Sequence, residues 1–425
     1  MPAPLPAELI DALVHGFEHG FPHLHLLVDL ERTFAREDLV AALESLVRAF
    51  PVLGCRYQPA WWRDRWVPWE GDLADLVRIE EVEDLEAATQ ALVREPLDVL
   101  AQPPVRLTAL AQGGRTRLVL SLHHMVADGG GVKAAGNVLA AALCGRTPDP
   151  RPDSQRSVLL AARALGLRDL PTLLVEAIRE GTRPLWILAA RRVARAEDAG
   201  PGDPAPRWRT VGLDGRGFGA ACRAEGATIN DGLVAAMARL AAARSASGPV
   251  CAGFTVDLRR FLPTRRGLVT NLHGVSLVML PRVTAAAPRA TLRAVSAIIG
   301  RQKERLPGLA YTLLPALLLA PLPHALLRVI GRPVLTSLER VLQRALAVTN
   351  IGPLDEALAP FGDQVRAASI LGPFVHGLSV PVVTATGFGG ALTLHVEATG
   401  SVAEAALDHL AEDLARALAE LQEGS

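Results

Sequence analysis

The sequence is poor in lysine, in cysteine and in net charge, and the last two shortages bear on the classes of function that remain. Lysine occurs only at Lys133 and Lys303, a bias towards arginine that we attribute to coding composition and from which we infer no function. The 44 basic residues are balanced by 44 acidic ones, so no global basic field favours a nucleic acid as partner. The four cysteines are widely scattered and predict neither a disulfide framework nor a cysteine metal site.

Membrane-spanning and secreted classes are also disfavoured. Residues 1–22 lack a basic start followed by an apolar run, so no secretory signal is predicted and a cytoplasmic location is the default expectation. Residues 307–327 carry no formal charge, but Pro315, Pro321 and Pro323 interrupt them, which predicts a buried or surface-lying helix pair. Residues 182–195 mix apolar residues with arginines. We expect an ordinary helix there, with peripheral membrane contact as the alternative.

Apolar periodicity predicts strands and helices in both halves of the 425 residues, which are 50% hydrophobic. Alternation predicts a strand over 23–30, and apolar residues at three- and four-residue steps predict a helix from Asp38 to Phe50. Thr228 and Asp231 have the spacing of a helix capping box. Further strands are predicted at 105–110, 117–122, 207–213, 251–258, 273–280, 345–350, 367–371, 378–386 and 391–398, with a closing helix from Ser401. This mixture predicts an α/β (α+β) fold of two lobes, residues 1–150 and 207–425, joined by a connecting segment at 151–206.

The most informative stretch is residues 121–131, where an alternating strand leads into His123 and His124, then Asp128 and three glycines. Histidine suits proton transfer near neutral pH. Adjacent histidines at a strand end point to opposite sides and cannot easily share one ion, so no metal site is predicted. No G-x-S-x-G segment supports a nucleophilic serine. The pattern favours one histidine as a general base with the other packed inward, although an isolated histidine pair is more often structural.

Residues 123–129 match the HHxxxDG motif of the chloramphenicol acetyltransferase-like superfamily. This superfamily includes peptide-synthetase condensation domains, wax ester and diacylglycerol synthases and polyketide-associated acyltransferases. Other segments resemble family blocks in the expected order, namely residues 95–98, 104–107, 228–231, 256–259, 270–271 and 348–353. The DFGWG block of plant-type members is missing, which disfavours that branch.

The resemblance implies two lobes in a V-shaped pseudo-dimer with a central tunnel, and His124 as the catalytic base midway along it. It implies structural roles at the active site for His123, Asp128 and Gly129, with Gly129 letting the backbone approach the reacting carbonyl. Asp128 is expected to pair with an arginine. Arg259 matches the motif, but Arg260 is adjacent and the sequence does not choose between them. Asn271 and Asn350 are candidate tunnel residues, with structural hydrogen bonding as the alternative. His273, His376 and His395 match no family motif and are treated as structural.

The implied activity is a standalone acyltransferase that moves an acyl group from a coenzyme A or carrier-protein thioester to a hydroxyl acceptor without an acyl-enzyme. The first alternative is a free-standing condensation enzyme that forms an amide in nonribosomal peptide or polyketide biosynthesis. The second is a catalytically silent protein used for binding or carrier recruitment. No bound cofactor is expected, because the acyl-CoA or phosphopantetheinyl thioester is a substrate. The expected partners are a small or lipid-like acceptor and an acyl carrier protein, and a site between two halves of one chain suits a monomer.

Overall fold

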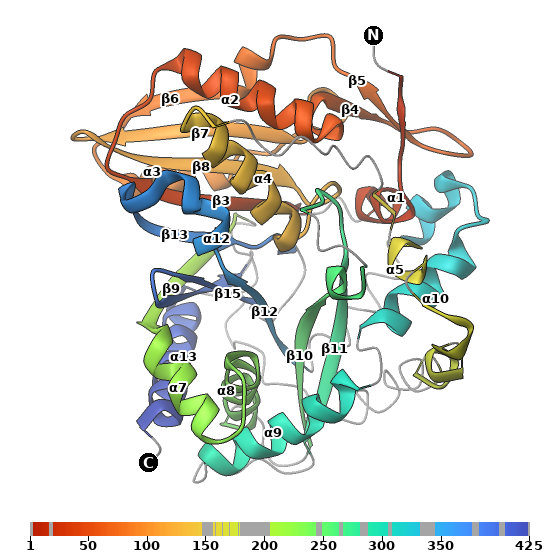
Figure 1. Ribbon diagram of the computed structural model, residues 1–425, viewed down its shortest axis with the longest axis vertical. Coiled ribbons are helices and arrows are strands. Elements are labelled where there is room, and N and C mark those ends of the chain that lie inside the picture. Colours follow the sequence, from red (N-terminus) through yellow and green to blue (C-terminus); the bar gives the residue numbers. More distant parts are fainter. Residues whose placement is uncertain are drawn as a thin grey trace.

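The computed structural model describes most of the chain in a series of segments. These are residues 3–16, 20–146, 156–157, 159–163, 165–169, 171–176, 178, 205–243, 249–262, 267–280, 288–304, 308–331, 345–375, 382–398 and 404–423. The predicted connecting segment, including residues 182–195, and His376 therefore lie largely or wholly outside the description. Two mixed sheets, each covered by helices, dominate the described part (Figure 1).

The first sheet contains the strand that ends in the paired histidines. Its order is β13 (Val365–Leu371), β3 (His23–Leu30), β8 (Arg115–His123), β7 (Val105–Gln112) and β6 (Val77–Glu81), antiparallel except between β6 and β7. Helices α2 (Arg36–Ala49) and α4 (Gly129–Leu143) share one apolar core with this sheet. The predicted strand over 23–30 is confirmed at both ends.

The second sheet has the order β11, β10, β12, β15, β16 and β9. Their bounds are His273–Leu280, Val250–Asp257, Ala345–Pro353, Val382–Phe388, Ala391–Ala398 and Arg207–Asp214. Helices α7 (Gly215–Ala224), α8 (Ile229–Ala243), α9 (Pro288–Lys303) and α13 (Glu404–Glu423) pack with it around a second core. The predicted capping box is confirmed, since the Thr228 N–H donates to Asp231 Oδ2 at 2.9 Å and the Asp231 N–H donates to Thr228 Oγ1 at 3.3 Å.

The two sheets do not divide at residue 207 as the two predicted lobes do. Strand β13 follows β12 in sequence but pairs with β3 at the edge of the first sheet, in the register Ser369 to Leu27. Strand β14 (Phe374–Val375) likewise pairs with β2 (Gly20–Phe21). The second half of the chain therefore completes the first sheet.

The remaining elements are short. They are β1 (Leu5–Pro6), α1 (Leu9–Gly16), η1 (Pro51–Gly54), β4 (Cys55–Gln58), β5 (Arg65–Pro68), η2 (Leu73–Leu76), α3 (Leu85–Val93), α5 (Leu159–Arg163), η3 (Leu167–Asp169), η4 (Leu258–Phe261), α10 (Leu309–Leu319), α12 (Asp355–Leu358) and η5 (Ala359–Gln364). The sequence at 171–176 and 324–331 is also helical. Strands β1, β5 and β4 form a small sheet of their own.

In the apolar stretch at 307–327, the helix is interrupted at fewer prolines than predicted. Helix α10 continues through position 315 and ends at Leu319, so the interruption falls at 320–323, around Pro321 and Pro323. Two helical segments flank it, as expected of a helix pair. Within the residues that the structure describes, no helix combines the length and the apolar character needed to span a bilayer.

The tryptophans of the β4–β5 region differ in burial. Trp66 is fully buried and its Nε1 donates to Asp11 Oδ2 at 2.8 Å. Trp61 and Trp62 lie at the tip of the hairpin, 75% and 55% exposed. The turn lifts them away from the core because Asp64 beside them is held inward by Tyr57 and by the Ala60 N–H.

Candidate active site

His123 and His124 leave the end of β8 on opposite sides. His123 is buried beside His23, its partner in the register of β3 and β8, and its Nδ1 accepts the Met125 N–H at 3.2 Å. Burial, reinforced by His23, lowers the pKa of His123 well below its ordinary value. His123 is therefore a neutral, inward-facing residue that shapes the turn, and it is His124 that is partly exposed.

The ring of His124 is held in one tautomer. Its Nδ1 lies 2.8 Å from the carbonyl oxygen of Ala127. A carbonyl can only accept, so Nδ1 carries the proton and donates, which leaves the lone pair on Nε2 unused by this contact. Burial, and after it the neighbouring His273, lower the pKa of His124 to about 4, so the imidazole is neutral near pH 7. A neutral ring with a free Nε2 can take up a proton.

Asp128 fixes the corner that follows. Its Oδ1 accepts the Gly131 N–H at 2.8 Å and so caps the N-terminus of α4. Its Oδ2 accepts the Leu272 N–H at 2.8 Å. Both oxygens also accept from the Arg259 guanidinium, at 3.0 Å and 2.8 Å. Burial acts to raise the pKa of Asp128, but Arg259 outweighs it and the pKa falls to about 2.

The structure identifies Arg259 as the partner of Asp128. Arg259 is buried and also donates to the carbonyl oxygens of Leu268 and Thr270, each at 3.0 Å, whereas Arg260 is exposed. Gly130 leaves the room that this guanidinium needs, since a Cβ there would collide with Arg259 Nη1. A Cβ on Gly129 would lie 2.8 Å from Ile351 Cγ1, so this glycine also allows the second half of the chain to approach closely.

The two predicted asparagines lie in different places. Asn271 is buried, and its Nδ2 donates to the carbonyl oxygens of His124 and Met125, the former at 2.6 Å. It therefore holds the backbone on which the His124 ring is mounted. Asn350, on β12, accepts the Gly352 N–H at 3.0 Å through Oδ1 and faces a cavity between the two sheets.

Two residues near His124 were not recognised as site residues from the sequence. His273 stacks on His124, with ring centroids 5.6 Å apart and planes inclined by 17°, and its Nδ1 lies 3.8 Å from Asp128 Oδ2. Its position two residues after Asn271, at the first residue of a predicted strand, was the only available signal. The second residue is Arg156, from the predicted connecting segment. It is buried, pairs with both oxygens of Asp11 at 3.0 Å, and donates to the Met125 carbonyl at 3.2 Å.

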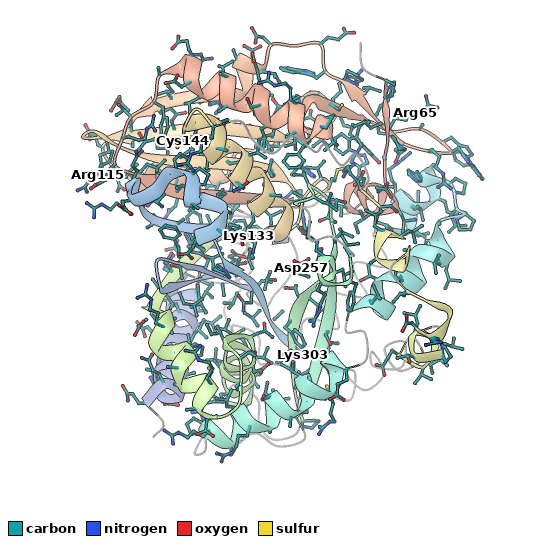
Figure 2. The ribbon with its side chains drawn as sticks, viewed as in Figure 1. Arg65, Arg115, Lys133, Cys144, Asp257 and Lys303 are labelled. Carbon is teal, nitrogen blue, oxygen red and sulfur yellow. The ribbon has the colours of Figure 1, made fainter. Side chains whose placement is uncertain are left out.

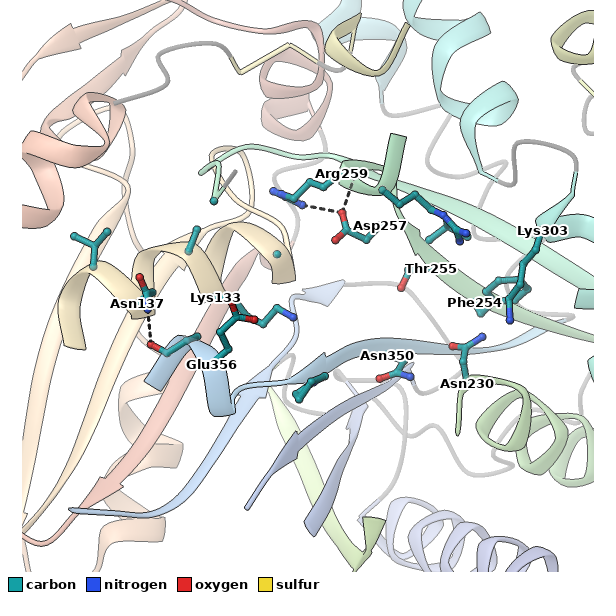
Figure 3. A pocket seen from close by; sticks show the side chains of 18 of the residues that line it. Lys133, Asn137, Asn230, Phe254, Thr255, Asp257, Arg259, Lys303, Asn350 and Glu356 are labelled. Carbon is teal, nitrogen blue, oxygen red and sulfur yellow. Dashed lines mark hydrogen bonds and ion pairs between the residues drawn. The ribbon is translucent and has the colours of Figure 1, made fainter. Parts of the chain in front are cut away.

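A cavity of about 940 Å³ adjoins this site through Gly130 and Arg259. Figure 3 shows Lys133, Asn350 and Glu356 on one side of it and Asp257, Arg259 and Lys303 on the other. Both lysines of the sequence therefore line one cavity, near the middle of the molecule (Figure 2). His124 is not among the lining residues, so a continuous tunnel past it remains a prediction. Among the described residues, no three His, Cys, Asp or Glu side chains are grouped so as to hold a metal ion.

Solved structures with this fold support the resemblance found in the sequence. The first condensation domain of the calcium-dependent antibiotic synthetase aligns over 99% of this chain and 97% of its own, with a TM-score of 0.71 and 17% identity. Polyketide synthase associated protein 5 from Mycobacterium tuberculosis aligns over 99% of both chains, with a TM-score of 0.69 and 15% identity. The trichothecene 15-O-acetyltransferase from Fusarium sporotrichioides aligns over 99% of this chain and 95% of its own, with a TM-score of 0.68 and 12% identity.

The sequence itself matches no protein-family model and no curated protein. These neighbours, which are a condensation domain, a polyketide synthase associated protein and an O-acetyltransferase, share the fold of this chain, so the predicted two-lobed α/β fold is confirmed. At these identities the likeness defines the fold and leaves the reaction to be argued from the site.

Proposed function

We propose that this chain is an acyltransferase that moves an acyl group from a thioester to a hydroxyl acceptor, with His124 as general base. The observation that carries the proposal is the fixed tautomer of His124, in which Nδ1 donates to Ala127 and Nε2 keeps its lone pair. Two neighbours in fold, an O-acetyltransferase and a polyketide synthase associated protein, are consistent with this class.

The proposed reaction needs no covalent enzyme intermediate. His124 Nε2 takes the proton from the acceptor hydroxyl while the oxygen attacks the thioester carbonyl carbon. When the tetrahedral intermediate collapses, the carbon–sulfur bond breaks and His124 returns the proton to the departing thiolate. Asp128 takes no part in the transfer, because its two oxygens are occupied by Arg259 and by backbone N–H groups.

We assign the donor to the cavity that contains the two lysines. Coenzyme A and phosphopantetheine both carry phosphate, and an ammonium group is a compact charge suited to it. Lys133 Nζ donates to the Ile351 carbonyl at 2.9 Å, and Lys303 lies 3.7 Å from Asp231, so both ammonium groups are held in place beside the open space. The cavity leads to Gly130 and Arg259, on the wall of the His124 site.

Replacing His124 tests the proposal. His124→Ala is expected to lower kcat for thioester-dependent acyl transfer by about 100- to 10,000-fold, the usual contribution of a positioned proton-transfer group. His409→Ala on α13 removes an exposed histidine and is the matched control. Product masses from paired alcohol and amine acceptors measure which bond is formed. Wild-type turnover in the His124 variant would refute the assignment of the base.

The acceptor panel also separates the alternatives. Acylation of amines with no acylation of any hydroxyl would replace our proposal by a condensation enzyme that forms amides. A protein that binds acyl thioesters and transfers none of them, with every acceptor, would favour a silent binding or recruitment role. The intact His124 site argues against that last outcome, because a protein that only binds has no use for a base held in one tautomer.

A further inference from the structure

A group of large apolar side chains is exposed along one edge of the molecule. Two belong to the tip of the β4–β5 hairpin, two to the last turn of α10, and two to the helical segment that follows. This tryptophan patch consists of Trp61, Trp62, Leu317, Leu318, Leu326 and Val329, each between 41% and 75% exposed. An apolar group of this kind on a folded surface indicates an interaction site.

Hydrogen bonds fasten the parts of the patch to one another. The His324 N–H donates to the Trp62 carbonyl at 3.0 Å, and the Ala325 N–H donates to the Trp61 carbonyl at 3.1 Å. Arg63 donates to the Leu322 carbonyl at 3.1 Å and to the Ala320 carbonyl, at the end of α10, at 2.6 Å. The hairpin tip and the turn between the two helices therefore form one braced surface, and no ordering of a loose loop is needed to present the tryptophans.

The two segments that carry the patch have a net positive charge. Residues 51–69 and 308–331 contain a single acidic residue, Asp64, and four arginines at positions 56, 63, 65 and 328. Asp64 is fully buried and is engaged by Tyr57, His324 and Arg328. Arg65 is exposed at the periphery, on the hairpin (Figure 2). Because Arg328 is paired with Asp64, the net positive charge of these two segments is carried by Arg56, Arg63 and Arg65.

We infer that the tryptophan patch docks this protein on an anionic lipid surface. Tryptophan is favoured at the boundary between headgroups and hydrocarbon, and arginines beside it attract anionic headgroups. The combination of shallow apolar side chains with flanking positive charge is the arrangement by which proteins lie on a membrane without crossing it.

The patch is connected to the candidate active site through helix α10. Helix α10 carries Leu317 and Leu318 at one end, and at the other end Gly308 packs against Gly274, the residue after His273. Gly308 has a φ of 73°, and a Cβ on Gly274 would collide with the Gly308 carbonyl, so the approach of α10 to β11 is close. If the proposed reaction holds, an apolar acceptor leaving the bilayer would meet the molecule on this side.

The experiment is flotation of the full chain with vesicles of phosphatidylcholine alone and of phosphatidylcholine mixed with phosphatidylglycerol. We expect binding to the anionic vesicles, lowered about tenfold or more by Trp61→Ser with Trp62→Ser, because two large side chains no longer enter the interface. Arg65→Glu should weaken binding to anionic vesicles and leave binding to neutral vesicles unchanged. Ile79→Ser on β6, exposed but outside the patch, is the matched control and should bind as wild type.

The outcomes separate lipid from protein contacts. Wild-type protein that fails to float with anionic vesicles, or a double tryptophan variant that floats as well as wild type, overturns the inference. So does a wild-type dimer that the double variant converts to a monomer without any vesicle binding, since the patch would then join two copies. Thermal melting of the double variant should match wild type, because both side chains are exposed. His124→Ala should bind vesicles normally, which keeps this test independent of the proposed reaction.

Discussion

Two buried carboxyl groups lie where the two parts of the fold meet. One of them is ionised near neutral pH and the other is neutral. At the candidate active site, Asp128 from the first half meets Arg259 from the second, and the pKa of Asp128 falls to about 2. At the second junction, Glu397 on β16 accepts the N–H of Gly372, the residue after β13, at 2.7 Å, and the Thr384 hydroxyl at 3.0 Å. Burial raises the pKa of Glu397 to about 8, so this carboxyl is neutral at pH 7.

The difference shows what decides the charge of a buried carboxyl group. Both are removed from water, which favours the neutral form. Only Asp128 receives a bidentate guanidinium in addition to two backbone N–H groups, and these more than offset burial. Glu397 accepts hydrogen bonds from one N–H and one hydroxyl only, and these do not offset the effect of burial on its pKa. The junction at the active site is therefore ionic, and the other is an uncharged hydrogen-bonded contact.

The largest expected effect comes from removing the cation of the ionic junction. Arg259→Leu leaves Asp128 buried without its partner, which is expected to lower the free energy of unfolding by about 3–5 kcal/mol. The measurement is denaturant unfolding near neutral pH, with Arg260→Leu as the control because that side chain is exposed. Equal losses in the two variants would contradict the assignment of Arg259 as the residue that holds the two halves together.

An intermediate effect is expected from Glu397→Gln, and it should depend on pH. The folded-state pKa of Glu397, about 8, lies above its ordinary value of 4.5, so its contribution to stability is complete below pH 4.5 and is lost as pH rises through about 8. The glutamine variant cannot ionise and should lack this alkaline loss. Asp128, whose pKa is lowered, contributes above pH 3.8 and loses its contribution as pH falls through about 2. The measurement is denaturant unfolding of wild type and Glu397→Gln across this pH range. If both lose the same stability as pH rises through about 8, Glu397 is not the neutral carboxyl that we describe.

The smallest expected effect concerns His273, which lies against both His124 and Asp128. His273→Phe keeps an aromatic ring on the stack and removes the imidazole that helps to lower the pKa of His124. The acid limb of the rate profile, expected near pH 4 in the wild type, should move to higher pH and stay below 6.5, because burial still acts. A pH profile of kcat/KM measures this shift. A profile that keeps its acid limb and loses activity as His124→Ala does would instead make His273 a participant in the reaction.

Local patterns in the sequence predicted the strands and the histidine corner well, because alternation and capping are short-range signals. Strands 23–30, 273–280 and 391–398 have the predicted bounds. The exchange of β13 into the first sheet was not predicted, since pairing between distant segments leaves no periodic signature. His273 and Arg156 were missed as site residues for the same reason. Whether a tryptophan is buried depends on the turn that carries it, and the sequence alone does not tell the buried Trp66 from the exposed Trp61.

The edge position of β13 has a consequence for synthesis of the chain. Strand β3 is made more than 300 residues before β13, so its outer edge finds its partner only when residues 365–371 have been translated. Until then a nascent chain carries an open strand edge, a known route to pairing between molecules. The active-site corner is also unbraced in that interval, since Arg259 and Asn271 follow it by more than a hundred residues. The geometry of the candidate site is thus completed late, and a chaperone that shields β3 during translation would act on the step most exposed to aggregation.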